Sequence, residues 1–508
     1  MDQTPTKRPA MNQPRASRKS RPTGQKATRA RRRRGVGGKP VEAQALEGLK
    51  QINLLAAGID IGSTENYVAV PAHTVKEGEP TVRCFGVTTP EQDAAVEWLR
   101  ACGVRTVAME ATGVYWITLH DKLEAAGMQV VLVDPHHVKA MPGRKSDVLD
   151  CQWLQQLHTY GLLRGAFRPD PHTRRLRTLT RQRADLVQTA ASHQTQMQKA
   201  LIEMNVQLHQ VVSDIDGETG LRIIDAILAG ERDPKVLVKL RDPRIRKSTV
   251  AEMEAALQGD YREELLFVLE QNREGWGFYR RQLEACDQRI LKTLESFPPA
   301  PPKSLGPLPP KSVPLCTKPG KEYVLKPAKA MGRGKNAPTV NLVEVLQRIC
   351  GVNLMAITGL NVVSVLMLLG EIGVDMSRWR SAKAFCSWLG LCPGTKISGG
   401  KVLSRRTRRV VNRAAVLLRV VAVAVGRSNS WLGRFHRRKK AHLGAPKAVT
   451  ATARKLACII YHVLRYQDPY VPINEAAYEA KARQQRLKRL HREAQEMGCK
   501  VVELQGVT

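Results

Sequence analysis

The sequence lacks the features that define disulfide-bonded, zinc-binding or membrane-spanning proteins. Its ten cysteines include no CxxC pair and no Cys/His spacing of a zinc site, so they are predicted to be reduced core thiols of a cytoplasmic protein. No run of about 18 apolar residues occurs. The richest stretch, 414–425, is short and carries Arg419. The basic N-terminus has no apolar segment behind it, so neither secretion nor membrane insertion is indicated.

Acidic residues are scarce beside basic ones. The 508-residue chain has 81 Lys and Arg against 46 Asp and Glu, a formal net charge of +35. This excess predicts a polyanionic partner, because a phosphate backbone binds basic surfaces through counterion release. Charge alone does not separate an enzyme from a ribosomal or chromatin-type binder without chemistry. With 43% hydrophobic residues, a chain of this length is expected to form two or three domains.

Changes in composition along the chain predict six segments. Residues 1–45 are polar and basic, with too few apolar residues to become ordered. The stretch 297–340 is rich in Pro, Lys and Gly, which is typical of a linker. The predicted segments are a disordered basic arm (1–45), an α/β domain (54–170), a helical coiled-coil domain (173–296), the linker or insertion (297–340), a mainly helical domain (343–470) and a charged helical tail (471–508).

The apolar pattern of the first domain predicts a mixed sheet. Three hairpin-like strands are followed by alternating helices and strands, which describes an α/β fold with helices packed on the sheet. The expected strands are 54–61, 67–70, 81–87, 104–109 and 129–133, and the expected helices are 91–101, 115–126 and 146–160.

Four acidic residues in this domain are expected to meet at one edge of the sheet. Asp60 lies in the first strand and Glu110 at the carboxyl end of the fourth, while Asp147 and Asp150 share a face at the start of a helix. Carboxylates are the ligands that Mg²⁺ and Mn²⁺ select, and two such ions about 3.5–4 Å apart catalyse phosphodiester cleavage. Asp147 also suits a helix N-terminus, capped by Ser146, without any metal.

The middle and C-terminal regions are predicted to be helical. A long amphipathic stretch from 173 to 294 suits a coiled coil or a helical hairpin, and the basic segment 230–248 within it suits a core or dimer contact better than a binding element. Residues 357–373 place a glycine turn before an apolar helix, as in a helix-hairpin-helix element that contacts a DNA phosphate. The same pattern also occurs in ordinary helix packing.

A serine in the C-terminal domain is the second candidate for chemistry. Ser398 precedes Gly399 and Gly400 in what the sequence predicts to be a flexible basic loop. No His or carboxylate stands near it in sequence to activate its hydroxyl, so a phosphate-contacting role and a nucleophilic role both stay open. The candidate phosphate-binding residues around it are Lys396, Lys401, Arg405, Arg406 and Arg408.

The acidic α/β domain together with the later motif GLCPGTKISGGK resembles the DEDD transposases of one bacterial insertion-sequence family, the IS110-type, bridge-RNA-guided serine recombinases. The resemblance covers about residues 54–470. It implies a RuvC-like domain of ribonuclease-H fold, a coiled coil, and a transposase domain with a catalytic serine. The turn Thr358–Gly359–Leu360–Asn361 departs from the usual PGxG pattern, which puts its phosphate contact in doubt.

The resemblance also implies roles for the candidate residues. Asp60, Glu110, Asp147 and Asp150 would bind Mg²⁺ or Mn²⁺, and Ser398 would attack DNA to form a transient phosphoserine link. A noncoding guide RNA would pair with donor and target DNA. The two domains would meet in a homodimer or homotetramer, in the bacterial cytoplasm at the nucleoid.

Three other classes of protein share part of these features. The motif GIDIGST at 58–64 also resembles the phosphate loop of actin-like sugar kinases and chaperone ATPases, but their downstream phosphate and adenosine motifs are missing. A metal-dependent RuvC-like junction nuclease would cut DNA without a covalent intermediate, with Ser398 only contacting a phosphate. A non-catalytic nucleic-acid binder would tolerate Asp60→Asn.

Overall fold

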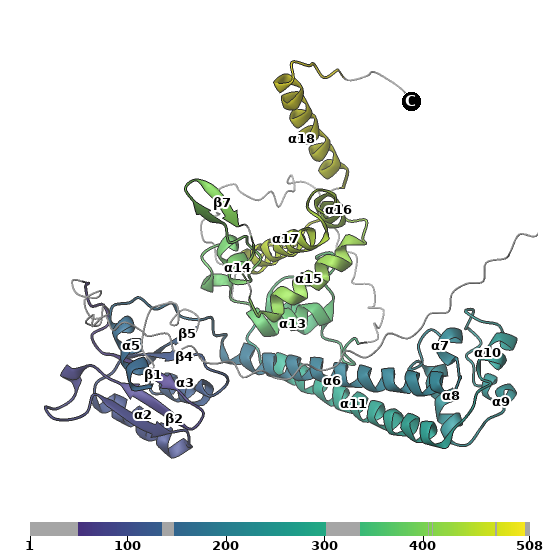
Figure 1. Cartoon of the computed structure of the whole chain (residues 1–508), viewed down its shortest axis with the longest axis horizontal. Helices are drawn as coiled ribbons and strands as arrows, with labels where there is room; N and C mark the ends of the chain where they lie inside the picture. Colours follow the sequence, from purple (N-terminus) through teal and green to yellow (C-terminus); the bar gives the residue numbers. More distant parts are fainter. Residues whose placement is uncertain are drawn as a thin grey trace, which may run out of the picture. The chain divides into compact units, whose positions relative to one another are not determined.

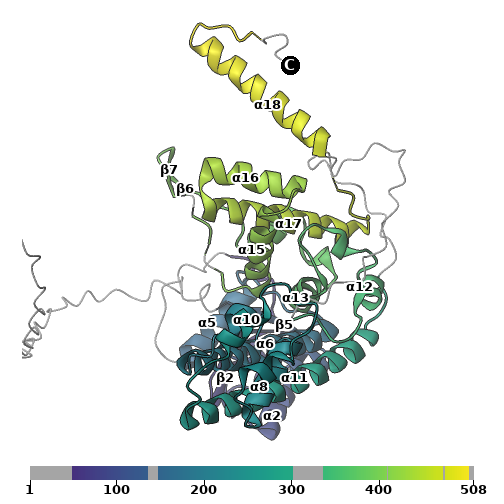
Figure 2. The same cartoon turned by 90° about the vertical axis from the view of Figure 1, so that its right-hand side faces the viewer.

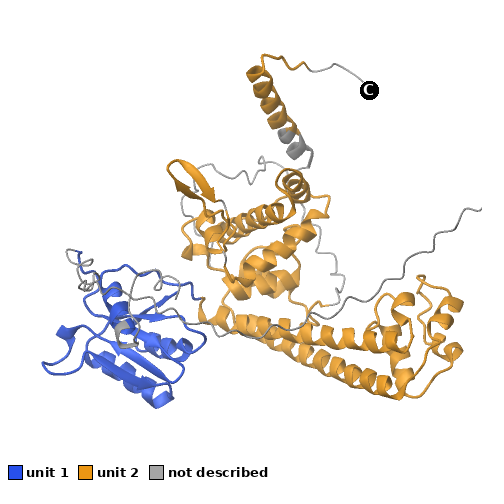
Figure 3. Ribbon diagram, viewed as in Figure 1, with its two compact units in different colours: residues 1–168 blue, residues 169–508 orange. Residues whose placement is uncertain are grey.

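The computed structural model describes residues 49–134, 147–300, 336–404, 406–408, 410–472 and 475–502 (Figure 1). The chain divides into two compact units, residues 1–168 and residues 169–508 (Figure 3). The predicted arm at 1–45 and most of the predicted linker at 297–340 lie outside the described residues.

The first unit is built on a five-stranded mixed sheet. Its strands are β1 (Ala56–Ile61), β2 (Glu65–Ala69), β3 (Val82–Gly86), β4 (Thr106–Glu110) and β5 (Gln129–Val133), in the spatial order β3-β2-β1-β4-β5. The first three strands pair antiparallel, whereas β1, β4 and β5 run parallel. This is the ribonuclease-H-like arrangement, and it confirms the α/β class and the mixed sheet that the sequence predicts.

Helices cover the two faces of this sheet. On one face, α2 (Thr89–Ala101) and α3 (Trp116–Ala125) bury their apolar sides against the sheet, forming a core that includes Ile59, Met109 and Leu119. The helix α5 (Asp147–Thr159) packs against β1, β2 and β4. The short 3₁₀ helix η1 (Ala72–Thr74) follows β2.

A long helical hairpin opens the second unit. The helices α6 (Pro171–Glu203) and α11 (Glu263–Glu295) lie side by side (Figure 1). Asp170 caps α6 by accepting a hydrogen bond from the Thr173 amide, and Pro171 suits the first helical position. The helices are antiparallel, because Arg183 meets Asp287 whereas the later His193 meets the earlier Asn272. The structure thus has the helical hairpin that the amphipathic pattern suggests.

A small helical cluster closes the far end of this hairpin. It consists of α7 (Leu208–Val211), α8 (Glu218–Leu228), α9 (Pro234–Val238) and α10 (Val250–Ala256). Leu237 and Val238, from the basic segment 230–248, are buried in its core. That segment therefore contributes to packing, as the sequence suggests.

A buried ion pair joins the two long helices. The Arg183 guanidinium donates to Asp287 at 2.5 and 3.3 Å, and both side chains are buried. Asp287 also accepts from the Thr339 amide at 2.9 Å, and Arg183 donates to the Asn336 carbonyl at 3.1 Å. Since a buried charge is tolerated only when it is paired and hydrogen-bonded, this cluster fixes the hairpin and the start of the following segment in place.

The rest of the second unit is mainly helical, as predicted (Figure 2). The central helix α17 packs against α14, α15 and α16. The elements are α12 (Val343–Cys350), η2 (Leu354–Ala356), α13 (Val362–Ile372), η3 (Met376–Arg378), α14 (Ala382–Trp388), β6 (Lys396–Ser398), β7 (Lys401–Ser404), α15 (Arg413–Gly426), α16 (Trp431–Leu443), α17 (Ala445–Tyr466) and α18 (Glu475–Glu496).

The base of the long hairpin is attached to α13. Arg177 donates to the carbonyls of Gly370 and Glu371 at 3.0 and 2.6 Å, at the C-terminal end of that helix. Arg181 forms a two-point ion pair with the Glu371 carboxylate, both bonds being 2.9 Å. Two-point guanidinium–carboxylate pairs fix orientation as well as distance. The helical hairpin and the α13 region are therefore one connected body within this unit.

The turn before α13 uses Gly359 at φ 93, where an added Cβ would lie 2.3 Å from a methyl of Val425, so the glycine serves packing against α15. The cysteines are predicted to be core thiols, but Cys84 and Cys499 are exposed. Among the described helices, none alone is long and apolar enough to cross a membrane, although α15 and α16 as a bent pair pass that test on length and composition.

Candidate active site

Two of the predicted carboxylates lie next to each other at the carboxyl ends of β1 and β4. The two strands are parallel, with Ile59 paired to Met109, so Asp60 and Glu110 are the next residues on neighbouring strands. Side chains alternate between the faces of a strand, and Ile59 and Met109 belong to the core under α2 and α3. Asp60 and Glu110 therefore face the opposite side, where α5 lies, and both are half-buried.

The direction of α5 brings its first turn to the same edge of the sheet. At its C-terminal end, the Thr159 carbonyl accepts from the Asn53 amide at 3.0 Å, just before β1 begins. His158 lies 2.8 Å from the Thr106 hydroxyl at the start of β4. The helix thus runs antiparallel to both strands, and its N-terminal turn, which carries Asp150, lies toward their carboxyl ends.

A glycine allows this helix to lie directly on the sheet. A Cβ added at Gly58 would lie 2.3 Å from the Cys151 carbonyl oxygen and 2.3 Å from the Gln155 nitrogen. These are backbone atoms of α5, which cannot give way as a side chain can. Only glycine therefore permits the close approach that brings α5 over β1 two residues before Asp60.

Two of the predicted ligands, Asp60 and Asp150, affect the pKa of the nearby Cys151 thiol. Burial is the first cause that raises the pKa of the Cys151 thiol to about 12, and the negative charges of Asp60 and Asp150 raise it further. Both carboxylates therefore lie within electrostatic range of the Cys151 thiol.

Asp60 and Glu110 thus lie on neighbouring strand ends, and Asp150 and Asp147 lie in the helical turn that faces this edge of the sheet. Among the described residues, Asp60, Glu110 and Asp150 do not form a group of three ligand atoms within 4.8 Å of one another. The side chain of Asp147 lies outside the described residues. Glu110 accepts a hydrogen bond from the Thr112 hydroxyl at 3.2 Å, which orients its carboxylate. A set of hard oxygen donors on two strand ends and one helix suits a divalent ion such as Mg²⁺.

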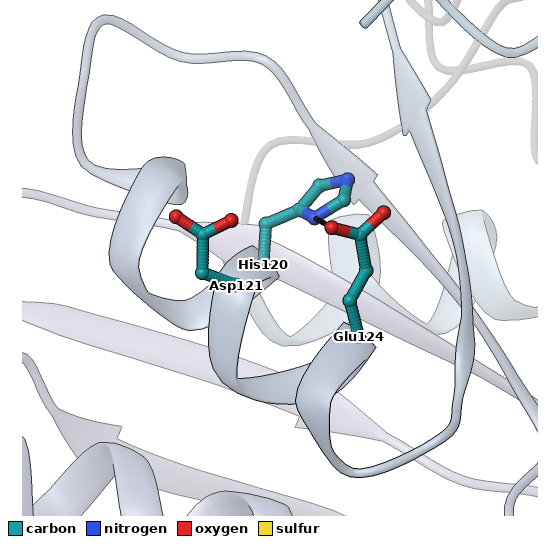
Figure 4. Close-up of side chains that lie close together, drawn as sticks. All are labelled: His120, Asp121 and Glu124. Atoms are coloured by element: carbon teal, nitrogen blue, oxygen red, sulfur yellow. Dashed lines mark ion pairs between the residues drawn. The ribbon is translucent and has the colours of Figure 1, made fainter. Parts of the chain in front are cut away.

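A second acidic cluster in this unit is already neutralised. His120, Asp121 and Glu124 lie close together on α3, with His120 Nδ1 3.5 Å from the Glu124 carboxylate (Figure 4). Arg168 donates to all three side chains, its bond to Glu124 being 2.7 Å, and also lies over the Trp116 ring. Burial, and then the charge of Arg168, lower the pKa of His120. An arginine here supplies the positive charge that a metal would bring, so this cluster is structural.

Ser398 lies at the tip of a β-hairpin, which corrects the flexible loop that the sequence predicts. It ends β6 and pairs with Lys401 of β7, and both residues are exposed. Gly399 and Gly400 form the two-residue connection with φ values of 53° and 75°. Two consecutive positive φ values are typical of the type I′ turn that closes tight hairpins. The signal was present in the sequence as a Gly-Gly pair between two short alternating segments.

The hairpin stands in a strongly basic region. Lys396, Lys401, Arg406 and Arg408 are exposed, while Arg405 lies outside the described residues. Residues 376–467 contain no Asp or Glu at all, although Lys and Arg recur throughout. A surface without acidic residues favours a polyanion, since no negative side chain from this stretch opposes its approach. This acid-free stretch is a stronger sign of nucleic-acid binding than any single cation in it.

Comparisons with known proteins agree with the fold. Residues 57–206 match a family model for a transposase, the DEDD transposase domain of the IS110 family. Residues 352–437 match a model described as transposase, IS116/IS110/IS902 family. No curated protein matches the chain. The chain is a DNA transposase/recombinase. It carries both domains of the IS110-family transposases, in the order in which the resemblance places them.

Proposed function

We propose that this transposase excises and integrates its insertion sequence by RNA-guided cleavage and exchange of DNA strands. In this proposal Asp60, Glu110, Asp147 and Asp150 hold Mg²⁺, and Ser398 is the nucleophile. The observation that carries it is that Asp60 and Glu110 lie side by side at the ends of β1 and β4, on the face of the sheet that α5 covers, within a DEDD transposase domain.

The carboxylates fit a divalent ion in chemical type. They are hard oxygen donors, and they sit on rigid elements whose approach is fixed by Gly58. When bound, Mg²⁺ would stabilise the negative charge that develops on the reacting phosphate. Asp60 and Glu110 provide fixed ligands from the sheet, whereas Asp147 and Asp150 add ligands from α5.

Ser398 is suited to attack a phosphodiester because it projects at the end of an exposed hairpin. The serine Oγ would form a bond to phosphorus as the bond from phosphorus to a sugar oxygen breaks, and the serine proton would end on that leaving sugar oxygen. The phosphodiester is thereby exchanged for a phosphoserine ester of similar energy. A sugar hydroxyl of another strand can then attack this phosphorus, which joins the new strand and releases the serine. Lys401, opposite Ser398, and the basic residues around it would bind the neighbouring phosphates.

The partners in this proposal are donor DNA, target DNA and a guide RNA, acted on by a homodimer or homotetramer at the nucleoid. Support comes from the resemblance to guided recombinases and from the acid-free stretch 376–467. RNA pairing would supply sequence choice, while the cations around Ser398 would contact backbone phosphates.

A cleavage assay tests this function. Purified protein, Mg²⁺, the flanking noncoding RNA and labelled donor DNA should give a covalent protein–DNA band, which both Ser398→Ala and Asp60→Asn abolish. Ser404→Ala, a serine on the same hairpin, is the matched control and should retain the band. Cleavage that survives Ser398→Ala but is lost in Asp60→Asn would instead identify a metal-dependent nuclease without a covalent intermediate.

A further inference from the structure

Two thiols in the C-terminal region lie in contact. The sulfur of Cys386, on α14, is 3.5 Å from the sulfur of Cys458, on α17. Cys386 is buried, whereas Cys458 is half-buried and therefore reachable by a small solute. The two sulfurs need to approach by only about 1.5 Å to reach the length of a disulfide bond.

The surroundings of Cys458 favour its thiolate form. The Cys386 thiol can donate to the Cys458 sulfur, and Arg454 and Lys455 add positive charge one turn earlier on α17. The hydrogen bond is the first cause that lowers the pKa of Cys458 to about 7, against the opposing effect of burial. The same bond raises the pKa of Cys386. Cys458 is thus the thiol that should react first with an oxidant, and Cys386 is the thiol that should react second.

These cysteines do not form a metal site with a third ligand. Among the described residues, the one group of three ligand atoms close enough for an ion is that of His120, Asp121 and Glu124. Cys392 lies near enough to Cys386 to influence its titration but completes no such group. Oxidation is then the chemistry that a contacting thiol pair offers.

We propose that Cys386 and Cys458 are a peroxide-sensitive pair that oxidises to an intramolecular disulfide. The Cys458 thiolate attacks one oxygen of hydrogen peroxide, the O–O bond breaks, and hydroxide leaves as the sulfur becomes a sulfenic acid. The Cys386 sulfur then attacks the sulfenic sulfur. The S–S bond forms, the S–O bond breaks, and the thiol proton leaves with hydroxide as water. In total, two thiols and one peroxide give one disulfide and two waters.

The location of the pair gives this oxidation a consequence. The disulfide would close a loop from Cys386 to Cys458, and that loop contains the hairpin of Ser398. A cross-link across such a loop restricts the conformations of the chain between its ends. Oxidation would therefore restrain the segment that carries the proposed nucleophile, although the thiol chemistry itself does not depend on the proposed function.

Peptide mapping of the full-length protein tests the proposal. The protein is treated with hydrogen peroxide at neutral pH, its remaining thiols are alkylated, and disulfides are identified by mass spectrometry. We expect a Cys386–Cys458 link to form about tenfold faster than oxidation of Cys84, an exposed thiol whose pKa is raised. Oxidation of all thiols at one rate, or a link between Cys386 and Cys392, would overturn the proposal.

Variants separate the two steps of this reaction. Cys386→Ser should leave a Cys458 sulfenic acid that a sulfenic-acid-specific reagent traps, whereas Cys458→Ser should give neither the disulfide nor this adduct. Cys392→Ser is the matched control and should form the link as the wild type does. Failure of Cys386→Ser to accumulate the trapped adduct, with wild-type thermal unfolding, would contradict the assigned order of attack.

Discussion

The two candidate sites are built in opposite ways. The carboxylates Asp60, Glu110 and Asp150 stand on two strands and a helix that press together without room for a single Cβ at Gly58. Ser398 stands on a two-stranded hairpin, and a Cβ added at either turn glycine would meet no other atom within 4 Å. Metal ligands need a fixed geometry before the ion arrives, so they suit a rigid core.

The exposed hairpin suits a different task. A nucleophile that must reach a large, bound substrate can be carried on an element with few contacts, because the substrate itself completes the ordering. Substitutions that disturb the packing around the carboxylates should therefore lower the stability of the fold. Substitutions in the hairpin should lower DNA cleavage and leave stability unchanged.

The largest effect is expected at Gly58. Gly58→Ala places a methyl group against backbone atoms of α5 and should destabilise the first unit by about 3 kcal/mol or more, because α5 must move off the sheet. Thermal unfolding of the full chain measures this. Gly165→Ala, where the new Cβ would meet only a Val131 methyl at 3.7 Å, should stay within about 0.5 kcal/mol. Equal losses of stability in the two variants would contradict the close packing of α5 on β1 at Gly58.

The close approach of α5 illustrates what sequence reasoning missed. The apolar periodicity predicts all five strands, and the meeting of Asp60 with Glu110 follows from two parallel strands ending together. A glycine inside a strand pattern does signal a close approach, but it does not say which element approaches. That depends on contacts with α5, almost a hundred residues away in the sequence.

The ion pairs between residues far apart in the chain could not be predicted from the sequence. The Arg183–Asp287 pair and the cluster of Arg168 with α3 join residues far apart in the chain, and nothing local distinguishes their side chains from solvated charges. The hairpin of Ser398, by contrast, was readable from its Gly-Gly turn. Its basic residues resemble those of solvated segments, so the composition predicts a flexible loop where the structure has a hairpin.

The second prediction concerns metal binding. Mg²⁺ should raise the thermal stability of the wild type by about 2.7 kcal/mol at a hundred times its dissociation constant, since the ion binds only the folded state. Asp60→Asn should remove most of this rise. Asp93→Asn removes an exposed carboxylate of α2 that pairs with Lys122 of α3, and this variant should retain the rise in stability. A rise that persists in Asp60→Asn would place the ion elsewhere.

The third prediction concerns His158, which holds the end of α5. Its pKa is lowered by burial, so the folded state keeps it neutral while the unfolded state binds a proton below about 6.5. Stability should therefore fall as pH drops below about 6.5 toward the folded pKa, by about 1 kcal/mol. His158→Gln should flatten this dependence in urea unfolding compared at about pH 7.5 and about pH 5.5. His120 acts in the same direction, so only the difference between variant and wild type counts.

The smallest effect on stability is expected in the hairpin turn. Gly399→Ala meets no steric clash but disfavours the positive φ of 53° by about 1 kcal/mol, so hairpin order and DNA cleavage should fall about fivefold. Thermal unfolding should not change. Gly399→Asn is the control, because asparagine adopts this conformation readily, and it should cleave as the wild type does. A lower melting temperature for Gly399→Ala would contradict the expectation that the hairpin contributes little to the stability of the fold.

The central claim is that Ser398 becomes covalently attached to DNA, and mass spectrometry of the reaction tests it most directly. Trypsin cuts after Lys396 and Lys401, which releases the peptide Ile397–Lys401, whose single hydroxyl side chain is that of Ser398. After nuclease digestion of a trapped reaction with Mg²⁺ and guide RNA, this peptide should carry a nucleotide, and Asp60→Asn should eliminate that modification. Cleaved DNA with this peptide unmodified, or a nucleotide found on another residue, would contradict the account.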